Sequence, residues 1–207
     1  MGKRGDELHE HILFAAKDVF LEMGFERASM DVISARAQTS KRTLYAHFES
    51  KEKLYLAVIE LVRGLYLEKL KTPADYAGDT TEALVLFCGR FLELLLWAPA
   101  IGMCRLGIAE AERFPDGSAQ FYHAMFTTTH ERLSAFIGER WKLKPKAAAL
   151  RADALLGTVL HPRFPRALFG IDEVSDERPD DEKIARAFDL ALIRKAAADA
   201  ALLVRAG

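Results

Sequence analysis

The stretch from residue 39 to residue 47 is rich in side chains that donate hydrogen bonds. Hydroxyl, ammonium, guanidinium, phenol and imidazole groups in such a run could bind phosphate oxygens or the edges of bases. The donors are Thr39, Ser40, Lys41, Arg42, Thr43, Tyr45 and His47. Leu44 and Phe48 lie four residues apart, so on a helix both would face a core while the donors occupy the other faces. This composition suits a helix that lies in the major groove of DNA.

The distribution of charge agrees with this interpretation. The chain of 207 residues has 29 Lys and Arg against 30 Asp and Glu, a net charge of −1 that excludes a globally basic nucleic-acid binder. From Arg27 to Lys53, six basic residues oppose three acidic ones, for a net charge of +3, whereas residues 1–26 carry −3. A solvated helical hairpin that binds a protein would show similar charges, so both interpretations stay open here.

The elements that would position this run are helical. Apolar residues recur at steps of three and four from Leu8 to Met23, and Gly24 suits the end of that helix. Ser29 and Ser40 are the expected N-caps of two short helices, 30–37 and 40–48, joined by Gln38-Thr39. Ser50 opens a longer helix to about residue 71. Two short helices joined in this way predict a helix-turn-helix.

The rest of the chain also shows a helical period. After a break at 72–78, Asp79 caps a helix that Pro99 ends, and another runs to about residue 113. The segment 114–117 is expected to be a turn, followed by a long helix through residues 122–137. Pro145 begins a further helix that ends near residue 161, and a charged stretch at 172–181 precedes a last helix ending at about residue 204. No segment alternates like a strand, so the prediction is an all-α fold.

Several function classes are disfavoured. Cys88 and Cys104 are too few for a disulfide framework and are expected to be buried thiols. The longest uncharged apolar run, 94–104, has 11 residues, short of the roughly 18 that a membrane span needs. The charged start of the chain is unlike a signal peptide, so we expect a soluble cytoplasmic protein with no membrane partner. Motifs of nucleotide binding, metalloproteases and hydrolases do not occur, and neither a cofactor nor a metal is expected.

A longer pattern in the first quarter of the chain resembles the N-terminal domain of TetR-family transcriptional regulators. The matching residues are Ile12, Ala15, Ala16, Phe20, Gly24, Phe25, Glu26, Ala28, Ser29, Met30, Ile33, Ala37, Ser40, Thr43, Leu44, Tyr45, His47, Phe48, Ser50, Lys51, Glu52 and Leu54. The resemblance implies a three-helix DNA-binding domain at 1–50 and a larger helical domain for effector binding and dimerisation at 51–207.

The resemblance also implies roles for single residues. Ser29, Tyr45, His47 and Lys51 fall where the family contacts phosphates. Thr39, Lys41 and Arg42 occupy the variable positions that read bases, and Arg42 could bond both O6 and N7 of guanine. One position departs from the family pattern: Gln38 stands where a glycine is usual, and a glutamine adopts such a turn at some strain.

The segment from Phe91 to Gly170 resembles the C-terminal domain of the AefR-like subgroup of the same family. The resemblance rests on Arg105-Leu106, Ile108 to Ala111, Arg113 to Pro115 and Phe121-Tyr122. It implies an effector domain, and large apolar side chains could line a cavity between its helices. The candidates are Trp97, Met103, Phe114, Phe121, Tyr122, Met125, Phe126 and Trp141, with Glu110, His123 and His130 as polar anchors. The same residues could instead form an ordinary core.

The function predicted from the sequence is a ligand-responsive transcriptional regulator that acts as a repressor. It would bind a palindromic double-stranded DNA operator as a homodimer and respond to a small-molecule effector. The expected dimer surfaces are the helix at about 145–160 and the last helix. Their candidate residues are Leu160, Ile184, Phe188, Ala191, Leu192, Ala198 and Leu202. A helical adaptor that binds protein through the same hairpin, and an enzyme, are the alternatives.

Overall fold

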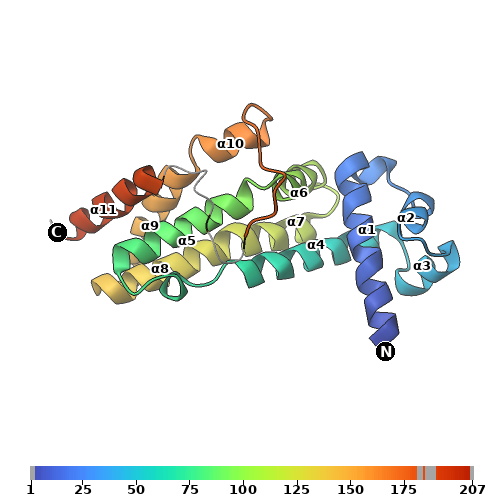
Figure 1. The fold of residues 1–207 in the computed structure, drawn as a ribbon, viewed down its shortest axis with the longest axis horizontal. Helices are drawn as coiled ribbons and strands as arrows, with labels where there is room; N and C mark the ends of the chain where they lie inside the picture. Colours follow the sequence, from blue (N-terminus) through green and yellow to red (C-terminus); the bar gives the residue numbers. More distant parts are fainter. Residues whose placement is uncertain (1–2, 181–183, 185–189, 206–207) are drawn as a thin grey trace. The chain divides into compact units, whose positions relative to one another are not determined.

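The computed structural model describes residues 3–180, 184 and 190–205, and the regular elements among them are helices. Within these ranges the structure has no strand and one isolated bridge, between Trp97 and Ser175. The helices are α1 (Lys3–Arg27), α2 (Met30–Arg36), α3 (Lys41–His47), α4 (Lys51–Lys69), η1 (Pro73–Asp75), α5 (Thr80–Leu95), α6 (Ala98–Ala109), α7 (Pro115–Tyr122), η2 (His123–Thr127), α8 (Thr128–Trp141), α9 (Pro145–Leu160), α10 (Arg163–Leu168) and α11 (Leu190–Arg205) (Figure 1). The predicted all-α fold is confirmed.

The chain divides into two compact units. The first comprises Met1–Leu65 and Gly102–Phe121, and the second comprises Tyr66–Ile101 and Tyr122–Gly207. The first unit therefore contains the segment 1–50 together with most of α4 and the segment 102–121. Helices α4 and α6 each contribute residues to both units.

The first unit packs α1, α2 and α3 around a core of fully buried side chains (Figure 1). The largest of these side chains are Ile12, Phe20, Phe25, Ile33, Leu44, Leu54 and Tyr55. Gly24 has φ = 75°, which ends the regular part of α1 and turns the chain toward α2. The regular helix therefore breaks at the expected glycine, and a short helical segment continues to Arg27.

The segment 114–117 is not the turn that the sequence predicts. Pro115 begins α7, since a proline has no amide hydrogen to lose in a first helical turn. Gly117 is buried within α7, and a Cβ there would lie 2.8 Å from Leu56 and 3.2 Å from Ile59. The glycine therefore serves close packing in the first unit rather than a reversal of the chain.

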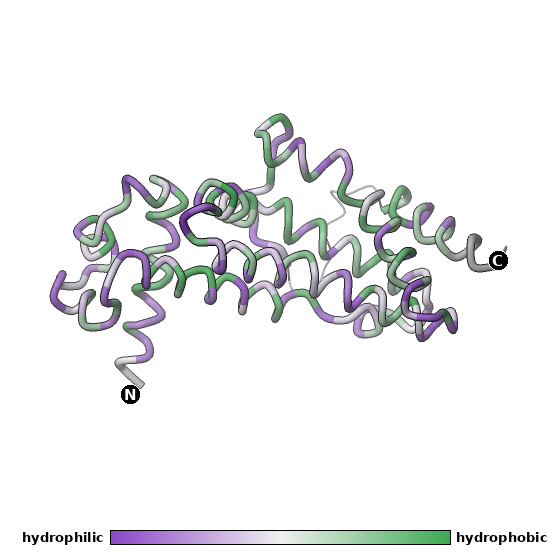
Figure 2. The backbone as a smooth tube through the Cα atoms, turned by 180° about the vertical axis from the view of Figure 1, so that it is seen from behind, coloured by the Kyte–Doolittle hydropathy of each residue, from purple (hydrophilic) through white to green (hydrophobic). Residues whose placement is uncertain are grey.

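The second unit is built around α5, which is buried on nearly all sides. Every residue from Ala83 to Leu95 is buried except Leu86, and α5 packs against α8, α9, α11 and η1. Figure 2 shows this hydrophobic helix among its more polar neighbours. No helix in the described parts of the chain is long and apolar enough to cross a membrane.

Both cysteines are buried free thiols, as the sequence predicts. Burial raises the pKa of the Cys88 thiol, and likewise that of Cys104, to about 12.

Candidate nucleic-acid interface

Serine residues cap both helices of the helix-turn-helix, as predicted. The Ser29 hydroxyl accepts a hydrogen bond from the amide of Val32 at 3.2 Å at the start of α2. The Ser40 hydroxyl accepts one from the amide of Thr43 at 3.0 Å and lies 2.8 Å from the Thr43 hydroxyl. These contacts fix where α2 and α3 begin, and they occupy three hydroxyl groups that were predicted to contact DNA.

The turn between α2 and α3 has a left-handed residue. Gln38 adopts φ = 49°, the region that favours glycine, and its amide donates to Ala35 O at 3.1 Å. The amide of Thr39 then donates to Ser34 O at 3.0 Å, which closes the turn. A glutamine in this conformation is strained by roughly 1–2 kcal/mol because its Cβ crowds the backbone.

Helix α3 divides into a buried and an exposed face. Leu44 and Phe48 are 0% and 5% exposed, so their predicted place in the core is confirmed. Lys41, Arg42 and Tyr45 lie on the exposed face, and the Tyr45 side chain is 45% exposed. The structure thus presents to solvent the three long polar side chains that the sequence assigns to base and phosphate contacts.

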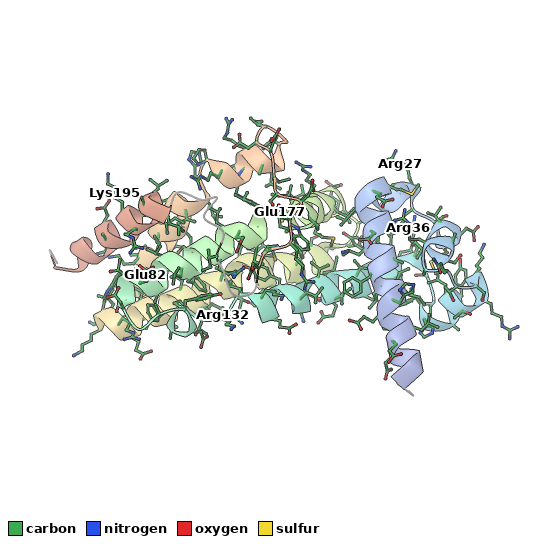
Figure 3. The ribbon with its side chains drawn as sticks, in the orientation of Figure 1. Arg27, Arg36, Glu82, Arg132, Glu177 and Lys195 are labelled. Carbon is green, nitrogen blue, oxygen red and sulfur yellow. The ribbon has the colours of Figure 1, made fainter. Side chains whose placement is uncertain are left out.

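Ion pairs occupy part of the basic patch. The Arg36 guanidinium binds both carboxylate oxygens of Glu22, at 2.8 and 2.7 Å (Figure 3), and this pairing lowers the pKa of Glu22. Lys41 pairs with Asp31 at 2.7 Å, mainly through a hydrogen bond that raises the lysine pKa. Arg42 has no ion-pair partner among the described residues. It is therefore the cation of α3 that is most available to a ligand.

Lys51, at the start of α4, lies beneath the end of α1. Its ammonium group donates to Phe25 O at 2.8 Å and to Ala28 O at 2.9 Å. The same group lies 4.2 Å from the centre of the Phe25 ring. These contacts satisfy carbonyl groups at the α1–α2 junction, so Lys51 joins the start of α4 to this junction.

His47 lies at the edge of the core. Its ring stands 5.7 Å from that of His9 and 6.4 Å from that of Phe48. The Nδ1 atom is buried and has no hydrogen-bond partner among the residues that the structure describes. Packing therefore fixes the ring at one end of α3.

Two of the predicted effector contacts meet in the second unit. The Phe126 ring lies 5.1 Å from Tyr122, and it also lies 6.3 Å from Phe91 and 5.6 Å from Phe164, two rings that were not predicted to take part. Met125 is buried beside Phe126 in sequence, whereas Tyr122 is 61% exposed. This aromatic cluster of Tyr122, Phe126, Phe91 and Phe164 joins α5, α10 and the α7–α8 segment.

Other predicted contacts have local partners. Phe114 packs within the first unit against Phe25 and Tyr55, with ring centres 5.0 and 4.8 Å apart, and Met103 and Phe121 are buried in that unit. The Trp97 indole donates to Asp176 O at 3.4 Å in the second unit.

The proposed polar anchors are also placed by the structure. His130 lies 3.1 Å from the Asp153 carboxylate, and Glu110 lies 3.8 Å from Arg113. His123 is exposed, and Trp141 is half-buried.

A small depression in the second unit lies elsewhere. It has a volume of about 30 Å³, which suits one or two water molecules. Its lining residues are Leu92, Thr158, Val159, His161, Pro162, Arg163, Leu192, Ile193 and Ala196, and no predicted effector contact is among them. The described residues contain no group of side chains that could hold a metal ion.

Sequence reasoning missed a polar cluster at the end of α4. The Tyr66 hydroxyl lies 3.1 Å from Met125 O and 2.9 Å from the Thr129 hydroxyl, and all three groups are buried. Met125 belongs to η2, a π-helical turn between α7 and α8. No signal in the sequence predicts a π turn, so the partner of Tyr66 was not foreseeable.

Comparisons with known proteins agree with this geometry. Residues 12–58 match the bacterial regulatory proteins of the tetR family, and residues 82–194 match the C-terminal domain of AefR-like transcriptional repressors. The chain is 44% identical over 75 residues to the HTH-type transcriptional activator FasR of Mycolicibacterium smegmatis, covering 34% of each protein. It is 38% identical over 83 residues to the HTH-type transcriptional repressor NicS of Pseudomonas putida, covering 40% of this chain and 39% of the relative. The matches thus span about a third to two fifths of the length of these curated relatives.

Solved structures match over nearly the full chain. A putative TetR-family transcriptional regulator from Mesorhizobium loti superposes with a TM-score of 0.76 at 21% identity, over 99% of this chain and 98% of the other. The flavonoid-responsive regulator FrrA superposes with a TM-score of 0.69 at 25% identity, over 96% and 95%. Because the C-terminal match alone covers more than half of the residues, the chain belongs to the TetR family of transcriptional regulators.

Proposed function

We propose that this regulator is a repressor that binds a palindromic operator as a homodimer and is released by a small effector. The observation that carries the DNA-binding part is the exposed Arg42, which has no ion-pair partner in the described part of the chain, on a helix whose opposite face is fixed by Leu44 and Phe48. The match of residues 82–194 to AefR-like repressors supports repression. Both signs of regulation occur among the relatives, since FasR is named an activator and NicS a repressor.

The proposed DNA contacts fall into two groups. Arg42, Lys41 and Thr39 would read bases, with Lys41 exchanging Asp31 for a base or phosphate. Tyr45 and His47 would bind phosphates. Ser29, Ser40 and Thr43 would act mainly by fixing the helix starts, whose amides face the backbone of the DNA, and Lys51 by holding α4 against the hairpin.

The proposed function assigns a different role to each of the two domains. Residues 1–50 would bind DNA, and residues 51–207 would bind the effector and dimerise. The exposed apolar surfaces of the second unit support the second role: on α9, Leu150 is 59% exposed and Gly157 has open space around it, and on α11, Leu192 is 46% exposed. Ile184 and Leu160 are half-buried, whereas Phe188 and the side chain of Leu202 lie outside the described residues.

The DNA proposal is tested by binding to the tightest duplex that the wild-type protein selects from a random pool, measured against salt. Phosphate contacts make the logarithm of the binding constant fall steeply with the logarithm of the salt concentration. Arg42→Ala should reduce the binding free energy by about 1–3 kcal/mol for the selected duplex and by much less for unrelated DNA. Arg140→Ala removes the same charge from an exposed site on α8 and serves as the control. Binding without a salt slope, or equal loss with both variants, would favour the protein-binding adaptor.

The effector proposal rests on the aromatic cluster of Tyr122, Phe126, Phe91 and Phe164. Its rings suit an apolar or amphipathic ligand, and FrrA, which is flavonoid-responsive by name, supports the same class of effector. A flavone and dodecanoate are suitable probes, because one is planar and the other a flexible chain. Release of the selected duplex by either probe, abolished by Phe126→Ala, is the expected result. Binding of either probe without loss of DNA affinity would contradict the proposal, since a ligand shifts an equilibrium only through differential affinity.

A further inference from the structure

A buried hydroxyl near the C-terminal end of α4 joins that helix to the segment between α7 and α8. The Tyr66 side chain is 6% exposed, and its hydroxyl lies 3.1 Å from Met125 O and 2.9 Å from Thr129 Oγ1. Thr129 Oγ1 itself donates to Met125 O at 2.7 Å. Each of the two hydroxyl groups has one hydrogen and can donate one hydrogen bond, so two of these three contacts are hydrogen bonds at any moment. Tyr66 and Thr129 therefore satisfy one another and a buried carbonyl group.

The carbonyl group in this cluster belongs to a π-helical turn. In η2 the amide of Thr128 donates to His123 O, five residues back, and the Thr128 hydroxyl lies 3.2 Å from the same oxygen. A π turn amounts to one extra residue in an α-helix, and such turns are rare and concentrated at functional sites. If the π turn became α-helical, the helix before η2 would rotate about its axis by about 100° relative to the helix after η2. Met125 O would then leave the Tyr66 hydroxyl.

A second contact holds the same turn of α4. The Arg132 guanidinium, from the next turn of α8, donates to Leu70 O just after the end of α4 (Figure 3). A cation at this point satisfies a terminal carbonyl and complements the helix dipole. Two contacts, one made by Tyr66 and one by Arg132, thus hold the last turn of α4 against the η2–α8 segment. Only the contact of Tyr66 depends on the π turn.

We propose that Tyr66 is the positioning residue that couples the segment His123–Thr127 to α4. This inference rests on the proposed function, because it names the group through which effector binding would reach DNA binding. Phe126 lies in the π turn and packs against Tyr122, Phe91 and Phe164, so a ligand that displaces Phe126 acts on the turn that holds Tyr66. Residues 51–65 of α4 belong to the first unit, and releasing Tyr66 removes one of the two contacts that hold the other end of the same helix. The π register with Tyr66 bound corresponds to the state that binds DNA.

The test uses Tyr66→Phe in the full-length protein, with Tyr55→Phe as the matched control. Both variants lose one buried phenol hydroxyl from α4, but the Tyr55 hydroxyl has no hydrogen-bond partner among the described residues. Tyr66→Phe should raise the dissociation constant for the selected duplex about three- to tenfold, the range that loss of one neutral hydrogen bond allows. Amide hydrogen exchange should accelerate about fivefold in residues 66–70 and 125–132. Tyr55→Phe should leave both quantities at the wild-type value.

Variants at Thr129 provide the second line of the test. Thr129→Val keeps the shape but loses the hydroxyl, and it should reproduce the effect of Tyr66→Phe, whereas Thr129→Ser should retain wild-type DNA affinity. Faster exchange in Tyr66→Phe without a change in DNA affinity would show a merely structural role and overturn the proposal. Unchanged exchange, or tighter DNA binding, would overturn it as well. If the wild-type protein selects no duplex, the proposed function fails first, and this measurement precedes all of the variants.

Discussion

The most strained residue of the helix-turn-helix is Gln38. Its φ of 49° is cheap for glycine and costly for any side chain with a Cβ. The strain is about 1–2 kcal/mol. A glycine at this position would avoid the strain, but it would also make the unfolded chain more flexible, which offsets roughly 0.5–1 kcal/mol of the gain in stability. A net cost therefore remains in the native turn, and the side chain that causes it is exposed beside α3.

Gln38→Gly should raise the free energy of unfolding by about 0.5–1 kcal/mol, because it removes this strain. Urea denaturation followed by circular dichroism measures the change. Gly24→Ala is the opposite control: at φ = 75° an added Cβ creates strain, and the variant should be less stable than wild type. A loss of stability in Gln38→Gly would mean that the glutamine side chain makes a stabilising contact that outweighs its backbone cost.

Lys51 is a second residue for which the structure suggests a test. The family resemblance implies a phosphate contact, and in the structure the ammonium group binds three carbonyl oxygens of the α1–α2 junction. Lys51→Met keeps the alkyl chain and removes these bonds, so it should cost about 1–3 kcal/mol of unfolding free energy. The slope of DNA binding against salt should remain that of wild type. A slope reduced by about one unit at unchanged stability would instead show a direct phosphate contact.

At the scale of elements, the sequence predicts what local chemistry determines. The N-caps Ser29, Ser40 and Asp79 are all found, because a short polar side chain before an apolar helical period has few other uses. The break in α1 at Gly24 follows from the same kind of local rule. Predictions from the sequence are wrong where tertiary packing determines the local structure. Gly117 lies inside a helix because neighbouring side chains need its space.

The candidate site shows the same division. The inward places of Leu44 and Phe48 follow from helical period, and so does the exposure of Arg42. The pairing of Glu22 with Arg36, 14 residues apart, depends on how α1 and α2 cross, which no pattern in the sequence encodes. The π turn is likewise a tertiary feature. It is defined by where α7 and α8 must place their side chains, rather than by any residue type.

Buried thiols on α5 and α6 give a prediction at this scale. Burial raises the pKa of both Cys88 and Cys104 to about 12, and the thiolate is the form that attacks disulfide reagents. A raised pKa lowers the thiolate fraction, so at pH 8 roughly one thiol in ten thousand is ionised. The native protein should not react with Ellman's reagent within minutes, and both thiols should react in denaturant. Rapid reaction of the native protein would show that α5 or α6 opens readily.

The whole molecule has a nearly neutral charge, and it also exposes several large apolar side chains. On the second unit, Leu150 of α9 and Leu192 of α11 are exposed, and the two helices pack against each other. Beyond its own helix backbone, no atom of the described residues lies within 4 Å of a Cβ added at Gly157 of α9, which permits close approach of another helix. A second copy of the same chain is the occupant that the proposed two-fold operator requires.

Leu150→Asp combined with Leu192→Asp should therefore convert a dimer to a monomer. Both side chains are exposed within one chain, so the charges should leave the monomer folded, whereas Leu160 is half-buried in its own unit. Burying unpaired carboxylates at the seam should cost at least about 3 kcal/mol of association free energy. Sedimentation velocity at micromolar concentration measures the assembly, and loss of binding to the selected duplex should accompany dissociation. Ile108→Asp is the matched control, because Ile108 is 67% exposed on α6 in the first unit and its replacement should leave the dimer intact. A wild-type protein that sediments as a monomer would refute the two-helix seam, and the regulator would then have to read its two half-sites through separate molecules.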